Sequence, residues 1–397
     1  MSDTKKPSRR DFLKGTTAAA GSAALLGGLN LARTAHAQGS DVIRVVLSGA
    51  GGRGTGAIAH LMNADKNLKL VAVADAFESR VNKCRDNLTK KYSDQVDLPD
   101  DRMFAGPEAY KDAIAVDADL VVLATPPGFR PLQFKAAIDA GRHVFMEKPC
   151  CVDAPGYTSL LKSAKSADDQ NLLVGVGLQR RHEPRYMEMI DRVHDGAIGK
   201  VMFTRVYWNG SGIWNRGRAE RAKQLGREPT ELEYQVYNWY HFCWVCGDNI
   251  SEQHIHNLDV GNWVMKDQNP IEANGMGGCT ARYLGDLKGT GQIFDHHFVE
   301  FTYADGTKMF SQCRHMAKCF NSVSEAAHGT EGSFDTIDLD RKTRSFQIRR
   351  PDGEVAWKFE GEKPNGHQQE QTDLMATLRA GKRYNEAYYG ANSSMTS

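Results

Sequence analysis

The sequence lacks a strong excess of charge of either sign. Its 50 Lys and Arg residues nearly balance its 49 Asp and Glu residues. Without the six basic and two acidic residues of the first 37 positions, the net charge changes from +1 to −3. Proteins that bind nucleic acid usually present a basic surface to the phosphates. We therefore expect no nucleic-acid partner.

Long apolar runs are also missing after the N-terminal leader, as are internal repeats and low-complexity tracts. A helix needs about 20 apolar residues to cross a bilayer, so we expect no membrane span. A second cysteine pair at zinc-ligand spacing is absent too. Cys243 and Cys246 lie among aromatic residues, and we interpret them as core thiols rather than as a zinc or redox site.

Residues 1–37 have the pattern of a twin-arginine export signal. Arg9 and Arg10 precede an apolar stretch over residues 16–29, and Ala35-His36-Ala37 provides a cleavage site. The apolar stretch is short and is interrupted by glycine, so we do not expect a retained anchor. The signal predicts a periplasmic or otherwise exported protein whose partners include the twin-arginine machinery. The other 360 residues suffice for roughly two domains.

The beginning of the mature chain has the order of a dinucleotide-binding fold. An apolar strand over residues 42–47 leads into a glycine turn, then into a helix over 55–62. A second strand over 68–74 ends at Asp75. This flanking context makes the glycine pattern a specific signal.

The glycine turn predicts NAD as the cofactor. Gly49 permits the tight turn, Gly51 lets the backbone approach the pyrophosphate, and Gly54 allows close helix packing. The acidic side chain at the end of the second strand can accept hydrogen bonds from ribose hydroxyls and would repel a 2′-phosphate. The cofactor-binding residues predicted here are Gly49, Gly51, Gly52, Arg53, Gly54 and Asp75.

Uniformly apolar strands continue to alternate with helical stretches up to residue 178. This pattern predicts an α/β fold with a doubly wound parallel sheet over 41–178. Residues 179–390 change to strands separated by glycine turns, which predicts an α+β domain with a largely antiparallel, open sheet for substrate binding and oligomerisation. The expected further strands are 119–124, 143–146, 172–176, 201–208, 297–303, 308–313 and 345–349, with helices over 129–140 and 154–167.

A polar, charged segment over residues 209–233 interrupts the second domain. We interpret it as a surface loop. It could cover the active site or a subunit contact, or it could simply be solvated.

The motif over residues 140–149, which ends in Glu147-Lys148-Pro149, follows Ala124-Thr125-Pro126-Pro127. With these motifs the chain resembles the Gfo/Idh/MocA family of oxidoreductases over residues 41–390. Thr125, Pro126, Glu147 and Lys148 follow strands and should open onto the cofactor crevice. The resemblance implies that Lys148 is catalytic and lies near the nicotinamide.

The resemblance also bears on oligomeric state and on the end of the chain. It implies a dimer or tetramer formed through the open sheet face. The chain ends at Ser397, where relatives commonly continue into a further helix and tail, as expected of a fragment.

A second family signature, an acid followed four residues later by histidine, is matched by Glu252 and His256. On one helix, Glu252, His256 and Asp259 would share a face. His256 is then the candidate general base, with Glu252 and Asp259 as catalytic partners. Glu252 stands where the family usually has aspartate, which leaves its role open.

Further candidates have weaker support from the sequence. Arg181 and Trp239 suit a sugar, which offers hydroxyl edges and apolar faces. His254 lies on a different helix face and is either a substrate contact or structural. Gly128 replaces a histidine that several family members carry. No metal is needed for hydride transfer, and we expect none.

The sequence thus predicts an exported NAD-dependent oxidoreductase with tightly retained NAD. It would oxidise a ring secondary hydroxyl of a sugar, glycoside or cyclic polyol. Two alternatives stay open. One is an NAD-dependent glycoside hydrolase that works by transient C3 oxidation and elimination, and the other is a non-catalytic dinucleotide-binding protein.

Overall fold

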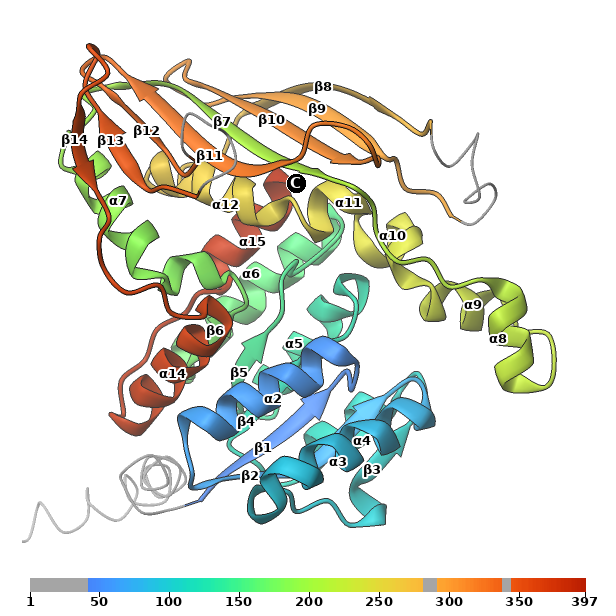
Figure 1. Ribbon diagram of the computed structural model, residues 1–397. Helices are drawn as coiled ribbons and strands as arrows, with labels where there is room; N and C mark the ends of the chain where they lie inside the picture. The colour runs from blue at the N-terminus through green and yellow to red at the C-terminus, as the bar shows by residue number, and fades with distance from the viewer. Residues whose placement is uncertain (1–41, 281–290, 338–343) are drawn as a thin grey trace, which may run out of the picture.

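The chain forms two β-sheets that are joined by helices (Figure 1). The structure is a computed structural model, and it describes residues 42–280, 291–337 and 344–397. The predicted export signal lies outside the described residues.

Sheet A is parallel throughout and has the strand order β3-β2-β1-β4-β5-β6. Its central strands are largely apolar and buried because helices cover both faces. The predicted doubly wound sheet is therefore confirmed. Its strands are β1 (Ile43–Ser48), β2 (Leu68–Asp75), β3 (Met103–Ala105), β4 (Leu120–Leu123), β5 (His143–Met146) and β6 (Val174–Val176).

Two groups of helices cover sheet A. One face packs against α2 (Gly52–Ala64) and α3 (Glu78–Tyr92). The other packs against α4 (Ala109–Ala115), α5 (Arg130–Asp139) and α6 (Ala154–Asp169).

The glycine turn after β1 depends on close backbone packing. Gly49 has a φ of +99°, and a Cβ there would lie 2.5 Å from the backbone carbon of Ala124. A Cβ on Gly54 would lie 1.9 Å from the Gly49 carbonyl oxygen. Helix α2 begins at Gly52, three residues before the predicted helix, because the turn itself forms the first helical residues.

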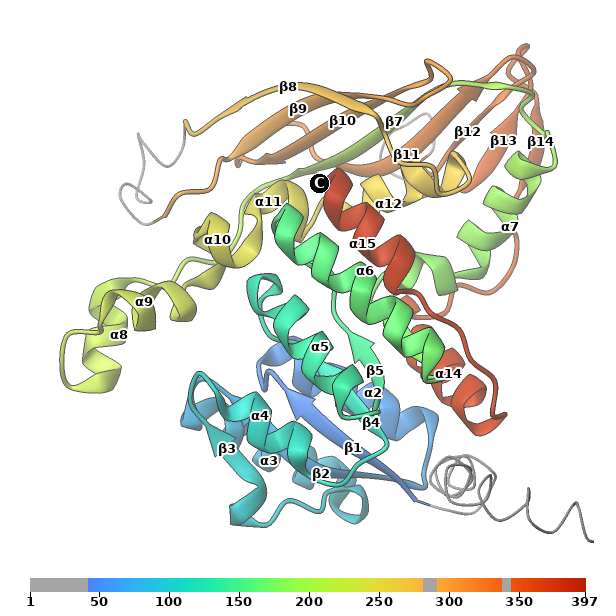
Figure 2. The ribbon, with the colours of Figure 1, turned by 180° about the vertical axis from the view of Figure 1, so that it is seen from behind.

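Sheet B has eight strands in the order β14-β13-β12-β11-β7-β10-β9-β8, and only the pairing of β7 with β10 is parallel. The predicted, largely antiparallel sheet is confirmed. Helices α7 (Pro184–His194) and α12 (Ile255–Val264) pack on one face, and no helix covers the other in either view (Figures 1 and 2). The strands are β7 (Val201–Gly210), β8 (Glu272–Gly278), β9 (His296–Thr302), β10 (Lys308–His315), β11 (Ser322–Gly329), β12 (Ser333–Asp335), β13 (Gln347–Arg349) and β14 (Val355–Lys358).

The last two helices return from sheet B to sheet A. Helix α14 (Gly366–Arg379) packs against α2, and α15 (Ala387–Thr396) packs against α6 (Figure 2). Apolar residues of both helices belong to the cores of sheet A. The end of the chain therefore fixes the two sheets relative to one another.

The prediction of a surface loop over residues 209–233 is wrong in its secondary structure. Asn209 belongs to β7, and two short helices follow, α8 (Arg218–Leu225) and α9 (Glu231–Tyr237). A capping box at Thr230 and Glu233 starts α9. The short length of these helices and their polar composition concealed them in the sequence.

Among the described residues, no helix combines the length and the apolar character needed to span a lipid bilayer.

Two glycines on α2 give a matched test of the turn. Gly54→Ala should destabilise the protein by about 2 kcal/mol or more, because its Cβ would clash with backbone. A Cβ at Gly56 would meet nothing within 4 Å, so Gly56→Ala should stabilise the helix by about 0.5–1 kcal/mol. Chemical denaturation measures both. Equal effects of the two variants would contradict the packing described here.

Candidate active site

Lys148 brings sheet A into contact with the second part of the chain. It lies two residues after β5, at the carboxyl edge of the sheet where ligands of such folds bind. Its Nζ donates to the Glu252 carbonyl oxygen at 2.6 Å and lies 3.2 Å from Glu252 Oε1. Both side chains are largely buried. The structure therefore brings two of the candidate residues, Lys148 and Glu252, into contact.

The segment that carries Glu252 and His256 is two helices rather than one. Helix α11 (Asp248–Glu252) ends at Gln253, and α12 begins at Ile255. The prediction of a single helix face is therefore wrong. The break places the Glu252 carbonyl oxygen outside a continuous helix, where it can accept from Lys148.

His256 is buried and held in its neutral form. Its ring lies 6.1 Å from that of Trp208, stacked at an interplanar angle of 27°. Burial lowers the pKa of His256 well below its usual value, and the nearby charges of Lys148 and Arg180 lower it further. Burial raises the pKa of Glu252. The positive charge of Lys148 opposes this rise and reduces it. A neutral imidazole is a proton acceptor.

Three buried polar atoms around this site find no hydrogen-bond partner within the described residues. They are Glu252 Oε2, His256 Nδ1 and the hydroxyl oxygen of Tyr240. The Tyr240 ring lies 6.2 Å from that of His315, whose Nε2 lies 2.7 Å from Oε1 of Gln253, the residue after Glu252. Burial and the Glu252 carboxylate both raise the pKa of Tyr240. Unpartnered buried polar groups cost about 1–3 kcal/mol each, which a ligand rich in hydroxyl groups would recover.

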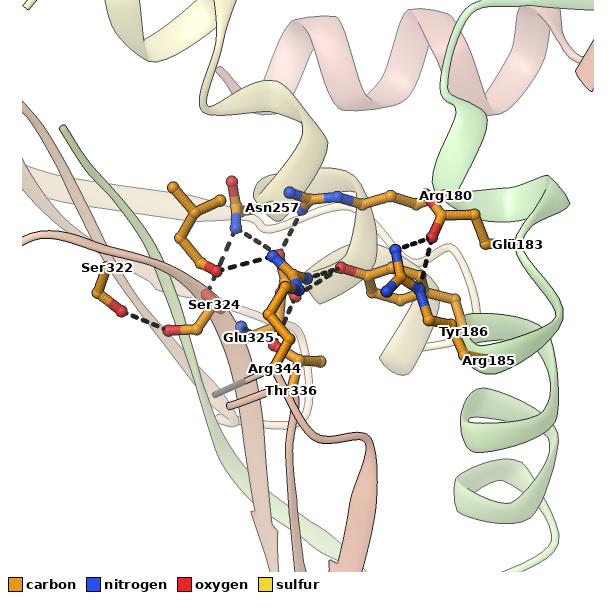
Figure 3. Close-up of polar contacts among 11 residues, drawn as sticks. Arg180, Glu183, Arg185, Tyr186, Asn257, Ser322, Ser324, Glu325, Thr336 and Arg344 are labelled. Atoms are coloured by element: carbon orange, nitrogen blue, oxygen red, sulfur yellow. Dashed lines mark hydrogen bonds and ion pairs between the residues drawn. The ribbon is translucent and has the colours of Figure 1, made fainter. Parts of the chain in front are cut away.

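Arg180 belongs to a buried polar network that Figure 3 shows. It forms an ion pair with Glu325, which also accepts from Asn257 and from the Tyr186 hydroxyl. Its guanidinium lies 6.0 Å from the ring of Trp208. The network fixes a second cation near His256. Nothing in the sequence pairs Glu325 with Arg180, which is 145 positions away.

The glycine turn can accommodate a dinucleotide. A Cβ built on Gly51 or Gly52 would meet nothing within 4 Å, so the space beside the turn is open. Helix α2 has no side-chain cap and no acid in its first turn, so its N–H groups are available to phosphate. Burial raises the pKa of Asp75, although its carboxylate accepts from Ala50 N and Phe77 N. Ribose hydroxyls would supply further donors to that carboxylate.

Arg53 links the turn to the Lys148 loop. Its Nε lies 2.5 Å from Glu147 Oε1, and another guanidinium nitrogen lies 2.7 Å from Glu370 Oε1 on α14. Thr125, after β4, donates its hydroxyl to Gln133, and Pro126 is the N-cap residue of the short helix η3 (Pro127–Phe129). The predicted cofactor residues thus lie on loops at one edge of sheet A.

Asp259 and Arg181, both candidate site residues, form an ion pair with each other and do not contact Lys148. Two guanidinium nitrogens of Arg181 contact the Asp259 carboxylate at 2.8–3.1 Å, and Ser393 donates to it at 2.8 Å. The Arg181 guanidinium also stacks 4.0 Å from the centre of the Tyr389 ring. The break before α12 removes the helix-face argument for Asp259. These contacts indicate a structural ion pair between the short helix η4 (Gln179–His182) and α12, against which α15 packs.

Trp239 and His254 also have structural surroundings. Trp239 packs against Trp214 and Tyr240. His254 is fully buried, its Nε2 lies 2.8 Å from Ser311 Oγ, and burial lowers its pKa to about 3. Tyr240, the neighbour of Trp239, carries the unpartnered hydroxyl that the sequence interpretation missed.

The thiols behave as core residues. Cys246 is buried, its Sγ donates to the Tyr240 carbonyl oxygen at 3.2 Å, and burial raises its pKa. A thiol of raised pKa is a poor redox nucleophile. The described part of the chain has no cluster of three or more His, Cys, Asp or Glu side chains arranged to hold a metal ion.

The chain was compared with known proteins. Residues 43–177 match the Gfo/Idh/MocA oxidoreductase family, described as having an NAD-binding Rossmann fold. The match confirms the predicted NAD-binding Rossmann fold of that part of the chain. Residues 6–27 match the twin-arginine translocation pathway signal sequence, which confirms the predicted export signal.

Individual relatives extend the comparison. Inositol 2-dehydrogenase of Rhodococcus jostii strain RHA1 is 30% identical over 165 residues, which are 41% of each chain. A glycosyl hydrolase family 109 protein of Shewanella amazonensis is 26% identical over 245 residues, covering 58% of this chain and 49% of that one. The chain thus spans about half the length of the curated relatives that it matches.

A solved structure confirms the fold of the whole described chain. The aldose-aldose oxidoreductase of Caulobacter crescentus superposes with a TM-score of 0.63 at 17% identity, covering 89% of this chain and 95% of that one.

The pairing of Asp259 with Arg181 makes a stability prediction. Asp259→Ala leaves the buried Arg181 charge without its main partner and should lower the free energy of unfolding by about 3 kcal/mol. Adding Arg181→Met should recover part of this loss, because the stranded charge is removed. Denaturant titrations of the three variants measure the cycle. Strictly additive losses would argue against the pair.

The burial of His254 makes a pH prediction. The unfolded chain binds a proton at this imidazole below pH about 6.5, whereas the folded chain binds it only near pH 3. Stability should therefore fall as the pH drops between these values, by up to about 1.4 kcal/mol per pH unit from this group. His254→Gln should show a shallower fall between pH 6 and 4 in denaturation experiments. An unchanged slope would contradict the assignment.

Proposed function

We propose that this exported protein is an NAD-dependent oxidoreductase that oxidises a ring secondary hydroxyl of a sugar, glycoside or cyclic polyol. One observation carries the proposal. Lys148, in the loop after β5, contacts Glu252 beside a buried His256, and three polar atoms of this site find no hydrogen-bond partner within the described residues. Such a site fits an alcohol that must lose a proton.

The glycine turn and Asp75 would hold the dinucleotide, with Thr125, Pro126 and the Glu147-Lys148 loop along the same edge of sheet A. NAD, when bound, would supply the hydride acceptor and be regenerated by returning hydride to a second carbonyl or to the same substrate. Export supports tight retention of NAD, because free NAD should be scarce outside the cytoplasm and the twin-arginine route carries folded proteins.

The proton is assigned to His256. As hydride leaves the carbinol carbon, the hydroxyl proton must leave in step, and the unpartnered Nδ1 of His256 can accept it. Burial, and after it the charges of Lys148 and Arg180, lower the pKa of His256 and so favour the deprotonated imidazole before the reaction. The Lys148 ammonium also favours alkoxide character on the substrate oxygen. Glu252 positions Lys148 through its carbonyl oxygen and carboxylate.

The ring substrate is suggested by the chemistry of the site and by the relatives. Tyr240 and Glu252 offer polar atoms to hydroxyl groups, and Trp208 lies beside His256 with an aromatic face suited to a sugar ring. The proteins to which the chain is similar include inositol dehydrogenases and an aldose-aldose oxidoreductase.

A second candidate function uses the same site. Similarity to the glycosyl hydrolase family 109 protein favours a hydrolase that oxidises C3 transiently. Oxidation acidifies the C2 proton and allows the glycosidic substituent to leave. Addition of water and re-reduction then complete hydrolysis without net oxidation.

We propose that the protein is a dimer or tetramer formed through the uncovered face of sheet B. Met276, Met202 and Phe298 on its strands expose 75%, 53% and 37% of their surfaces. Apolar side chains gathered on an open sheet are typical of an interface. Sedimentation of the mature protein tests this assembly.

Product analysis tests the function. Mature protein incubated with a panel of sugars, polyols and glycosides should yield a keto-sugar by mass spectrometry. Lys148→Met should lower its formation at least about 100-fold, because charge stabilisation is lost, while NAD still raises the melting temperature. The control is Lys162→Met, an exposed lysine on α6.

Other outcomes separate the alternatives. Release of an aglycone without net NADH would select the hydrolase. Unchanged turnover in Lys148→Met, with NAD still bound, would contradict the assignment of Lys148, and turnover of no compound would favour a non-catalytic binding protein.

A further inference from the structure

Residues 211–247, which we call the arm, leave the end of β7 and return to α11. The arm contains α8, α9 and the short helices η5 (Trp239–His241) and α10 (Cys243–Cys246). In both ribbon views α8 and α9 lie well away from sheet B (Figures 1 and 2). Packing against sheet B therefore does not hold α8 and α9 in place. Two contacts with the loops of sheet A hold the arm instead.

The first contact lies at the loop after β4. A Cβ on Gly128 would lie 2.5 Å from the Trp244 carbonyl oxygen of the arm. The Trp244 ring meets Phe129 edge-on, with centroids 5.8 Å apart. Gly128, noted in the sequence as the replacement of a histidine, is thus the residue that lets α10 approach this loop.

The second contact lies at the loop after β2, two residues beyond Asp75. The Phe77 ring meets Tyr237 of the arm edge-on at 6.2 Å. The guanidinium of Arg221, on α8, lies 4.7 Å from the centre of the Phe77 ring and 4.9 Å from that of Tyr237.

These two contacts bracket the glycine turn. The strand order of sheet A is β2-β1-β4, so the turn after β1 lies between the two loops that the arm touches. The arm therefore runs along the carboxyl edge of sheet A, from the loop after β4 to the loop that would face the adenosine ribose.

Three arginines that form no ion pair within the described residues gather at the second contact. The Arg80 guanidinium lies 4.9 Å from the centre of the Phe77 ring. The pKa of Arg216 is lowered first by burial and second by the positive charge of Arg80. Within the described residues, neither of these nor Arg221 forms an ion pair, whereas the neighbouring Arg218 pairs with Glu231. Arg221 is 8% exposed, and its Nε has no hydrogen-bond partner among the described residues.

We propose that the arm closes the adenosine end of the dinucleotide site and retains the cofactor, with Arg221, Arg216 and Arg80 facing the adenine and the phosphates. Guanidinium groups stack on flat aromatic faces and attract phosphate charge. The Arg80 charge also opposes the rise that burial causes in the pKa of Asp75, so this arginine lies near the carboxylate that would face the ribose. The inference rests on the proposed NAD-dependent function. It adds a reason why an exported protein would keep its nucleotide.

The test compares two charge-removing substitutions on the same helix. Arg221→Met removes a guanidinium that faces sheet A, whereas Lys223→Met removes an exposed ammonium from α8. Bound nucleotide is released by denaturation and counted, and its dissociation is followed by gel filtration at intervals after purification. We expect Arg221→Met to release NAD about tenfold faster than wild type and Lys223→Met to match wild type.

A second measurement needs no variant. Trypsin can cut the arm at Arg218, Lys223 and Arg227, which are exposed or half-buried. Added NAD should slow cleavage in the arm more than cleavage elsewhere in the wild-type protein. Equal protection everywhere would overturn the proposal.

The outcomes separate the arm from the function. If wild type binds no NAD, the proposed function itself fails. If wild type binds NAD but Arg221→Met releases it at the wild-type rate, only the arm proposal fails. A loss confined to NADP, with NAD unaffected, would also overturn it, because the cluster would then recognise a 2′-phosphate.

Discussion

The contact of Lys148 with Glu252 is the constraint on which the site depends. It joins the carboxyl edge of sheet A to the helix break before α12, and it places a cation where burial already disfavours a charged imidazole. Neither side chain would be tolerated alone in such a position, because an unpaired buried charge is costly. The pair therefore permits a buried, deprotonated His256 beside an ammonium group.

Two further features hold this contact in place. Arg53 connects the glycine turn to Glu147 and to Glu370 on α14, so the cofactor turn, the lysine loop and the returning helix share one group of charges. Helices α14 and α15 then pack against sheet A, which fixes the distance between the two sheets. Cofactor binding and the geometry at Lys148 are consequently coupled through Arg53.

Much of the fold was predictable because burial leaves a direct trace in composition. Strands covered on both faces are largely apolar, as in β1, or completely apolar, as in β4, and Gly49 and Gly54 mark backbone that cannot accept a Cβ. Polar elements leave no such trace. Helices α8 and α9 and strand β11 were missed since their stability comes from caps, ion pairs and neighbouring strands instead of from an apolar period.

For this protein, the sequence by itself determined the export signal, the dinucleotide fold and the identity of Lys148 and His256 as candidates. Those features depend on local order along the chain. Only the tertiary structure decided that Asp259 pairs with Arg181, that Arg180 pairs with Glu325, and that the arm reaches sheet A. Each of these is a contact between residues far apart in the chain, and chain order carries no record of which buried charges meet.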